Sequence, residues 1–231
     1  MALDLEYKRR IEKWQEYLKK RIFTPLKAVE LEGYKTKELL SLSDLESKAF
    51  VPMKEGTPWG EKWEYCWFKT VITLDESVKG KRIVFAGEPG GESSVYINGK
   101  HAGAFDFNHH YVTLTKCAEG NERFEILMEC YAGHGIREHK AIPCPPGFET
   151  VPEPPKNQTV VGHSVVGVWY EDIYQLWLDI NTLYEIRNNI DPTSLRVVKI
   201  DKLLKEYTLT IDLEQPTEKL NEDCKNFRER V

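Results

Sequence analysis

The sequence predicts a mainly β protein with flanking helices, in which a jelly-roll β-sandwich lies between an N-terminal helix and a C-terminal helical segment. Three observations indicate this fold. Short segments of alternating apolar residues recur between positions 63 and 131, as in sandwiches and jelly rolls. Asn98-Gly99 is a strong signal for a two-residue hairpin. Apolar residues at spacings of three and four mark helices near both ends of the chain.

Residues 1–58 are predicted to form a helix and a lead-in to the sandwich. The apolar face of the helix consists of Leu3, Tyr7, Ile11, Trp14, Leu18 and Ile22. Lys19, Lys20 and Arg21 suit the negative end of the helix dipole, and Pro25 is expected to end the helix. Positions 26–62 are less regular, with short polar stretches and the turn-like Pro58-Trp59-Gly60.

The first long strand is predicted at 63–74, and both of its faces are apolar. One face carries Cys66, Phe68, Ile72 and Leu74, and the other carries Trp63, Tyr65, Trp67 and Val71. A half-exposed antiparallel strand alternates with polar residues instead. We therefore expect the sandwich core to cover one face and a helix, a loop or another domain to cover the other.

The β domain is predicted to span 59–170. Ile83 with Phe85, and Val95 with Ile97, mark two further short strands. An inward-facing row is formed by Phe124, Ile126, Met128 and Cys130. Six of the 12 prolines lie between positions 143 and 155, so a proline-rich arm is expected at 141–155. Positions 159–170 are expected to return to the sheet as an extended segment.

Residues 171–231 are predicted to be helical and to lead toward a catalytic domain that this chain lacks. The apolar pattern of the first helix consists of Ile173, Leu176, Trp177, Ile180, Leu183 and Tyr184. A second helix should begin near Asp191-Pro192-Thr193-Ser194 and continue the pattern through Leu195, Val198, Leu203 and Tyr207. After Pro216 the segment is very polar, with few apolar residues to bury.

Composition argues against several classes of partner. The net charge of −5 gives no basic surface for nucleic acid or anionic membrane. No apolar run approaches the roughly 20 residues of a membrane helix, and the N-terminus lacks the apolar core of a signal peptide. The five cysteines show no Cys-x-x-Cys pair. Reduced thiols and a cytoplasmic location are therefore expected.

The sequence offers no recognisable catalytic, cofactor-binding or metal-binding residues. His109 and His110 are adjacent, so on a strand they would point to opposite faces and could not share one metal ion. The run His134-Gly135-Ile136-Arg137-Glu138-His139 has one residue too many for an inverted metalloprotease motif. No Gly-x-Ser-x-Gly is present, and the glycines near position 90 lack the lysine of a phosphate-binding loop.

Aromatic residues are dense in the β domain and carry the candidate contact site. The candidates for carbohydrate or interdomain contact are Trp59, Trp63, Trp67, Tyr96 and Tyr111. Exposed rings would stack on sugars, whereas buried rings would belong to the core or to an interface. Packing in the core or between domains is the favoured interpretation.

The order of these signals resembles the N-terminal region of glycoside hydrolase family 38 α-mannosidases of the cytosolic and bacterial kind. The resemblance rests on Trp59-Gly60, Trp67-Phe68-Lys69, the hairpin at 95–99, Asp106 and His109, the run 129–135 and the closing helices. It implies a galactose-binding-like jelly roll that precedes a catalytic domain with zinc and an Asp nucleophile. That domain's first zinc-binding signature, His-x-Asp, does not occur in this sequence. Neither the metal ligands nor the nucleophile can therefore be assigned here.

The resemblance implies an accessory domain, inactive alone, of a retaining and zinc-dependent α-mannosidase. Its expected partners are its own catalytic domain, a mannoside or oligosaccharide, and a second copy in a homo-oligomer. One alternative is a free-standing carbohydrate-binding jelly roll. Another is a structural domain of some other glycosidase, because a fold does not fix a function.

Overall fold

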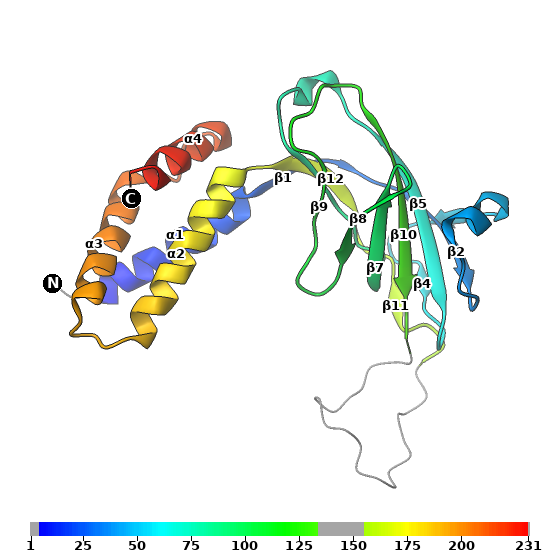
Figure 1. Ribbon diagram of the computed structural model, residues 1–231, viewed down its shortest axis with the longest axis horizontal. Coiled ribbons are helices and arrows are strands. Elements are labelled where there is room, and N and C mark those ends of the chain that lie inside the picture. The colour runs from blue at the N-terminus through cyan, green and yellow to red at the C-terminus, as the bar shows by residue number, and fades with distance from the viewer. Residues whose placement is uncertain (1–4, 134–154, 231) are drawn as a thin grey trace, which may run out of the picture. The chain divides into compact units, whose positions relative to one another are not determined.

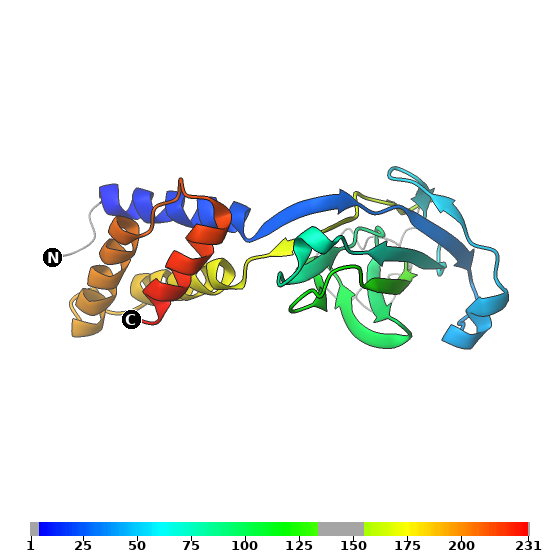
Figure 2. The ribbon, with the colours of Figure 1, turned by 90° about the horizontal axis from the view of Figure 1, so that it is seen from above.

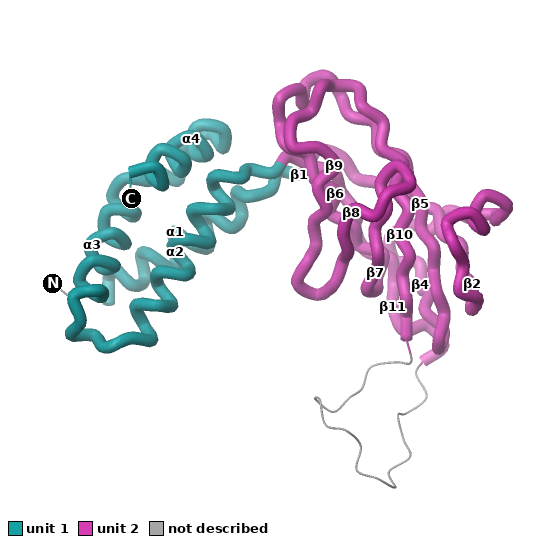
Figure 3. Tube along the Cα trace, viewed as in Figure 1, with its two compact units in different colours: residues 1–24, 169–231 teal, residues 25–168 magenta. Residues whose placement is uncertain are grey.

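A computed structural model describes residues 5–133 and 155–230, which form two compact units (Figure 3). The first unit holds the described residues up to Thr24 and those from Trp169 onward; the second runs from Pro25 to Val168. The boundary predicted at 58/59 differs from this division because residues 25–58 contribute strands to the second unit. The predicted boundary at 170/171 lies close to the observed one. The motif at 134–139 and almost all of the predicted arm at 141–155 lie outside the described residues.

The larger sheet of the second unit has six strands in the order β3-β2-β5-β10-β7-β8 (Figure 1). The strands are β2 (Leu31–Thr36), β3 (Val51–Met53), β5 (Tyr65–Thr73), β7 (Glu92–Ile97), β8 (Lys100–Phe105) and β10 (Arg123–Tyr131). All five neighbouring pairs are antiparallel. This architecture confirms the predicted sandwich.

The second sheet has four strands in the order β1-β12-β6-β9, and a short pair joins β11 to β4. These strands are β1 (Phe23–Ala28), β4 (Pro58–Trp59), β6 (Ile83–Ala86), β9 (Val112–Thr115), β11 (Thr159–Val160) and β12 (Val165–Trp169). Two 3-10 turns, η1 (Leu42–Ser47) and η2 (Glu76–Val78), complete the second unit. The predicted strands around Ile83–Phe85 and Val95–Ile97 and the extended segment at 159–170 are all present.

The core lies between the two sheets. The predicted inward row is confirmed, because Ile126, Met128 and Cys130 are buried and Phe124 is half-buried. Phe85 of β6 meets Phe105 of β8 edge to face, with ring centroids 5.7 Å apart. Aromatic contacts of this geometry stabilise a core beyond the area that they bury.

The Asn98-Gly99 hairpin is confirmed. Asn98 and Gly99 have φ angles of 50° and 75°, the two positive values that a type I′ turn requires. The amide of Asn98 donates to the Glu125 carbonyl at 2.8 Å, and the Glu125 amide donates to the Asn98 Oδ1 at 2.9 Å. The turn is therefore tied to the neighbouring strand β10.

Positions 26–62 contain more regular structure than the sequence indicates. Strands β2 and β3 extend the six-stranded sheet beyond β5, and β1 joins the other sheet. Five of the six residues of β1 are exposed, so this strand carries no apolar alternation that could reveal it. Pairing with distant strands, rather than local pattern, fixes these elements.

The prediction that both faces of β5 are covered holds only for its first half. Trp67 on the outer face is 1% exposed, but Val71 on the same face is 51% exposed. Trp63 precedes the strand and has a φ of 63°, so it belongs to the entering turn. The outer face therefore passes from covered to open along the strand.

The first unit consists of α1 (Leu5–Arg21), α2 (Glu171–Asn189), α3 (Leu195–Thr210) and α4 (Thr217–Arg228). Helix α1 runs beside α2 in both views (Figures 1 and 2). The Nε2 of Gln15 in α1 donates at 2.9 Å to the Trp177 carbonyl and at 2.9 Å to the Asn181 Oδ1. The hydroxyl of Tyr207 in α3 donates to the Gln15 Oε1 at 2.9 Å. The N-terminal helix is therefore part of the C-terminal helical unit.

The three C-terminal helices are present, and α2 buries Ile173, Leu176 and Ile180 as predicted, but the buried face of α3 differs in part from the prediction. Leu195 is 80% and Val198 49% exposed, while α3 buries Val197, Leu204 and Tyr207. Helix α4 buries Leu220, Cys224 and Phe227 on one face despite its polar composition. No helix in the described part of the chain combines the length and apolar character that crossing a membrane requires.

Candidate functional site on the outer face of the six-stranded sheet

Trp59, the first of the predicted contact residues, belongs to the core. Its side chain is fully buried and its Nε1 donates to the Pro89 carbonyl at 2.8 Å. Its ring meets Phe68 edge to face at 5.7 Å. A ring in this position cannot reach a sugar.

The other four predicted residues are distributed over different parts of the second unit. Trp63 lies in the turn before β5, where its amide donates to the Gly133 carbonyl at 2.7 Å. Tyr111 lies just before β9, and burial together with the nearby Glu88 carboxylate raises its pKa. Trp67 and Tyr96 come together on the outer face of the six-stranded sheet, with stacked rings 6.2 Å apart.

The strand register places the residues of this outer face in rows. One row consists of Tyr65 on β5, Tyr131 on β10 and Glu92 on β7. The next row consists of Trp67, Glu129, Ser94 and Ala104, on β5, β10, β7 and β8. Residues directly opposite one another on antiparallel strands have Cβ atoms about 5 Å apart. These two rows therefore form one continuous patch.

The patch contains an open hollow of about 470 Å³, which we call the tyrosine hollow. It is lined by Leu39, Tyr65, Glu92, Ser93, Ser94, Ala104, Phe105, Asp106, Glu129 and Tyr131. Ser94 and Ala104 have small side chains beside the rings of the neighbouring strands, which leaves room above them. Tyr65 and Tyr131 stack with ring centroids 4.6 Å apart and form one wall.

The charged side chains that line the tyrosine hollow are all acidic among the described residues. Burial raises the pKa of the Glu129 carboxyl. The His109 side chain and the Asn108 amide lower the pKa of Asp106, whose Oδ2 lies 2.8 Å from the His109 Nδ1. No lysine or arginine is among the described residues that line the hollow. The site therefore offers hydrogen-bond acceptors and an aromatic wall, and it disfavours anions.

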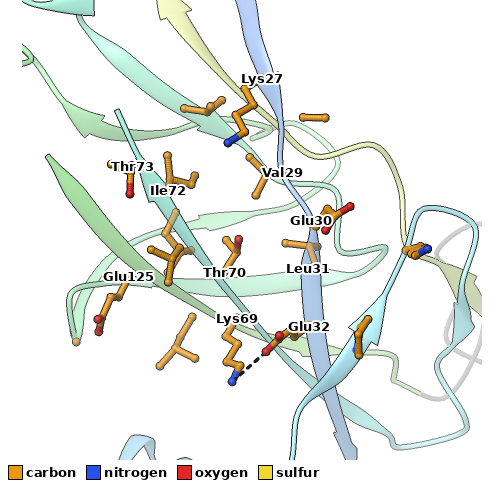
Figure 4. Close-up of a pocket in the computed structure, with 18 of the residues that line it drawn as sticks. Lys27, Val29, Glu30, Leu31, Glu32, Lys69, Thr70, Ile72, Thr73 and Glu125 are labelled. Carbon is orange, nitrogen blue, oxygen red and sulfur yellow. Dashed lines mark ion pairs between the residues drawn. The ribbon is translucent and has the colours of Figure 1, made fainter. Parts of the chain in front are cut away.

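A second and larger hollow of about 1070 Å³, the edge groove, lies beside the second half of β5 (Figure 4). Figure 4 shows Val29, Glu30 and Leu31 on one side and Thr70, Ile72 and Thr73 on the other. The ion pair between Lys69 and Glu32, 3.0 Å apart, lies at one end. The groove exists because β2 leaves β5 at this pair and continues back toward β1 in the other sheet.

The edge of β5 that faces this groove is open. Pairing with β2 stops at Lys69, and no other described strand pairs with that side of Thr70–Thr73. The Leu74 amide donates to Glu122, and the Glu64 carbonyl accepts from Ala132, so even-numbered positions face β10. The peptide groups of Val71 and Thr73 therefore point into the groove. This stretch carries no proline or charged side chain of the kind that usually protects an edge.

The described residues contain no group of three or more His, Cys, Asp or Glu side chains that could hold a metal ion. A zinc site therefore does not fit the described residues, since zinc needs three or four converging ligands. The two hollows offer hydrogen-bond acceptors, an aromatic wall and an open strand edge, and these features support binding or docking.

Sequence reasoning missed Tyr131, Glu129 and Ser94 as a group. Glu129 and Tyr131 do alternate with the buried row on β10, which was a usable signal. Their neighbours Glu92 and Ser94 lie more than thirty positions earlier in the chain. Only the register of β10 with β7 brings them together.

The described part of the second unit is thus an antiparallel β-sandwich with two surface hollows. A family model described as "Alpha-mannosidase, jelly roll domain" matches residues 24–187. The chain therefore belongs to the alpha-mannosidase jelly-roll domain family. The matched range includes every strand but the first residue of β1, and it ends within α2.

A curated relative is human alpha-mannosidase 2C1, 21% identical over 169 residues. The match covers 72% of this chain and 16% of the relative. The chain therefore spans about a sixth of the length of that protein.

Among solved structures the chain is similar to bacterial β-glucuronidases. The Faecalibacterium prausnitzii enzyme matches with a TM-score of 0.41 and 13% identity, over 64% of this chain and 31% of that one. The Ruminococcus gnavus enzyme matches with a TM-score of 0.43 and 12% identity, over 64% of this chain and 28% of that one.

Proposed function

We propose that this chain is the accessory jelly-roll part of a retaining, zinc-dependent α-mannosidase and that it braces the catalytic domain of that enzyme. The observation that carries the proposal is the family match over residues 24–187, which covers nearly the whole sandwich. The named relative, an alpha-mannosidase, is much longer than this chain. Catalysis and zinc binding would belong to the remainder of the enzyme.

The edge groove supports a bracing role. Val71 and Thr73 present unpaired peptide groups there, and an extended segment of the catalytic part would satisfy them as an added strand. Buried Ile72 and Leu31 and half-buried Val29 supply an apolar lining, while Lys27 and Glu30 supply charges at the rim. An aligned segment would thereby gain both backbone hydrogen bonds and apolar burial.

The remaining expectations belong to the same proposal. The enzyme would be cytoplasmic, in keeping with Cys66 and Cys130, which lie directly opposite each other and are both free. The outer face of the sandwich would contribute to the rim of the active site or to contacts in a homo-oligomer. A nucleic acid or a membrane is not among the proposed partners.

An activity assay of the purified chain tests the proposal. With an aryl α-mannoside and added zinc, we expect no turnover above the rate without protein, because the described residues contain no group of side chains that could hold the zinc ion. The control is an established α-mannosidase in the same buffer. Turnover that follows the concentration of this chain, and that a chelator abolishes, would contradict the accessory role.

A further inference from the structure

We propose that the tyrosine hollow on the outer face of the six-stranded sheet is a binding site for a neutral saccharide. The residues that would contact the ligand are Tyr131, Glu129, Glu92 and Ser94. This is a second surface, distinct from the edge groove at the other end of β5, and it gives the domain a ligand of its own. The choice of a mannoside among neutral saccharides rests on the proposed function.

The hydrogen-bond acceptors that line the hollow indicate a ligand with many hydrogen-bond donors. Glu129 and Glu92 carry carboxylates, and Ser94 carries a hydroxyl in the same two rows. The Asp106 carboxylate already accepts hydrogen bonds from the amides of Asn108 and His109 and contacts the His109 side chain. We therefore do not count it among the residues that contact the ligand. Sugar hydroxyls donate to carboxylates, whereas a phosphate or a uronate would be repelled.

The Glu129 carboxylate is partly buried and can accept hydrogen bonds from such a ligand. Burial alone raises its pKa, which means that the carboxylate has lost part of its water shell. No described side chain donates a hydrogen bond to it, whereas the nearby Asp106 has its donors in place. A polar group that is partly desolvated and unsatisfied gains most from a ligand that replaces the lost hydrogen bonds.

The two tyrosines supply the apolar half of a sugar site. The Tyr131 side chain is 39% exposed and stacks on Tyr65, which holds the ring in place against the sheet. The C–H face of a pyranose packs on an aromatic ring, while its hydroxyls reach polar groups beside that ring. Here the register places Tyr131 next to Glu92 and one row from Glu129.

The volume of the hollow suits a small ligand. About 470 Å³ lies within the range of small-molecule sites, although the hollow is open on one side. Weak binding of a single sugar residue is therefore expected, because much of the ligand stays in water. Ala104 sets the size of the hollow, since a larger side chain at this position would occupy the space above Ser94.

Titration of the full 231-residue chain with methyl α-mannopyranoside, followed by saturation-transfer NMR and by the ring signals of the tyrosines, tests the proposal. We expect saturable binding that Tyr131→Ala and Glu129→Gln each weaken by about tenfold or more. Ala104→Leu should block binding by filling the hollow without removing any contact group. Tyr111→Ala is the matched control, because Tyr111 is 43% exposed and lies outside the hollow.

The outcomes separate this proposal from the proposed function. Weaker binding in Tyr131→Ala and Glu129→Gln and blocked binding in Ala104→Leu, with the Tyr111→Ala variant unchanged, support the saccharide site. Three results would overturn it. These are the absence of saturable binding, binding by Ala104→Leu as tight as by the unchanged chain, and tighter binding of choline or of methyl glucuronide than of the mannoside. None of these results touches the accessory role, which the turnover assay decides. Circular dichroism of each variant confirms that the sheet is intact.

Discussion

At the scale of single residues, Cys66 and Cys130 are structural and not reactive groups. Cys66 and Cys130 are fully buried and lie opposite each other on β5 and β10. Burial raises the pKa of the Cys66 thiol to about 12 and that of Cys130 well above its ordinary range. Since the thiolate is the reactive form, neither can serve as a nucleophile or as a ready metal ligand.

We predict that alkylation distinguishes these thiols. In the folded chain at neutral pH, iodoacetamide should label the exposed Cys117 and leave Cys66, Cys130 and Cys224 unlabelled. All four should react after unfolding in urea. Peptide mass spectrometry gives the extent at each position. Labelling of Cys66 at the rate of Cys117 in the folded chain would contradict the burial of this core.

A second prediction concerns alkaline pH. Burial raises the pKa of the Cys224 thiol from 9.0 to about 12. Below about pH 9 both folded and unfolded states keep this proton; between pH 9 and 12 only the folded state does. The free energy of unfolding therefore falls as pH rises through this window, by at most about 1.4 kcal/mol per pH unit for this group.

Urea unfolding at pH 8 and pH 10 measures this effect. Cys224→Ala lacks the thiol, so its free energy of unfolding should fall less between the two pH values than that of the unchanged chain. Other groups with a raised pKa, such as the Cys66 thiol, are present in both proteins and cancel. Equal falls would show that the Cys224 thiol titrates normally in the folded chain.

At the scale of elements, helix α2 depends on a cap from another helix. Its first residues follow Tyr170, which makes no side-chain capping bond. Asn221 of α4 supplies the cap, since its Oδ1 accepts from the amides of Asp172 and Ile173 at 3.0 and 3.2 Å. The Asn221 Nδ2 also donates to the Asp172 Oδ2 at 3.2 Å. A distant residue thus satisfies donors that a local cap normally covers.

Asn221→Ala should lower the free energy of unfolding of the helical unit by about 1–2 kcal/mol, the usual cost of losing an N-cap. The control is Glu222→Ala on the next residue, which removes an exposed ion pair with Lys219 and should cost about 0.5 kcal/mol or less. Thermal unfolding followed by far-ultraviolet circular dichroism compares them. Equal stabilities of the two variants would rule out the cap.

The open edge of β5 gives a prediction for the longer enzyme. Val71→Lys should leave the isolated chain as stable as before, because a 51% exposed surface residue contributes little there. In an enzyme that also carries the catalytic part, the added charge should block strand addition and lower the melting temperature. Val160→Lys is the matched control, also 51% exposed but outside the edge groove. Equal effects of the two changes would argue against docking at this edge.

The elements also show where sequence reasoning reaches its limit. The β7–β8 hairpin was predictable because Asn98-Gly99 encodes its turn locally. Strands β1 and β2 were not, since β1 is mostly exposed and β2 is fixed by pairing with β5. The tyrosine hollow depends on register in the same way. Residues of each strand were visible in the sequence, but their neighbours across the sheet were not.

At the scale of the whole molecule, the two ends of the chain build one unit. Helix α1 packs with helices that begin about 150 positions later. The alpha-mannosidase jelly-roll match begins after α1 and ends within α2, so α1, α3 and α4 lie outside the matched range. The helical unit is therefore held together by contacts that the family match does not cover, and Gln15 is central to them.

Gln15 ties three helices through one buried side chain. It is 7% exposed, it donates to α2 and it accepts from the fully buried Tyr207 of α3. Gln15→Leu leaves the Tyr207 hydroxyl buried without a partner, so we expect the free energy of unfolding to fall by about 2–3 kcal/mol. Tyr207→Phe alone should cost less, since the amide of Gln15 keeps its bonds to α2.

The double variant distinguishes a shared network from two separate defects. Gln15→Leu with Tyr207→Phe removes both partners, so its cost should be smaller than the sum of the single costs by about 1 kcal/mol or more. Tyr184→Phe is the control, because its hydroxyl donates to Glu12 at 3.1 Å on the surface. Hydrogen exchange should report faster opening in α1, α2 and α3 together for Gln15→Leu. Strict additivity, or faster exchange confined to α1, would mean that the N-terminal helix only rests on the others and does not hold the unit together.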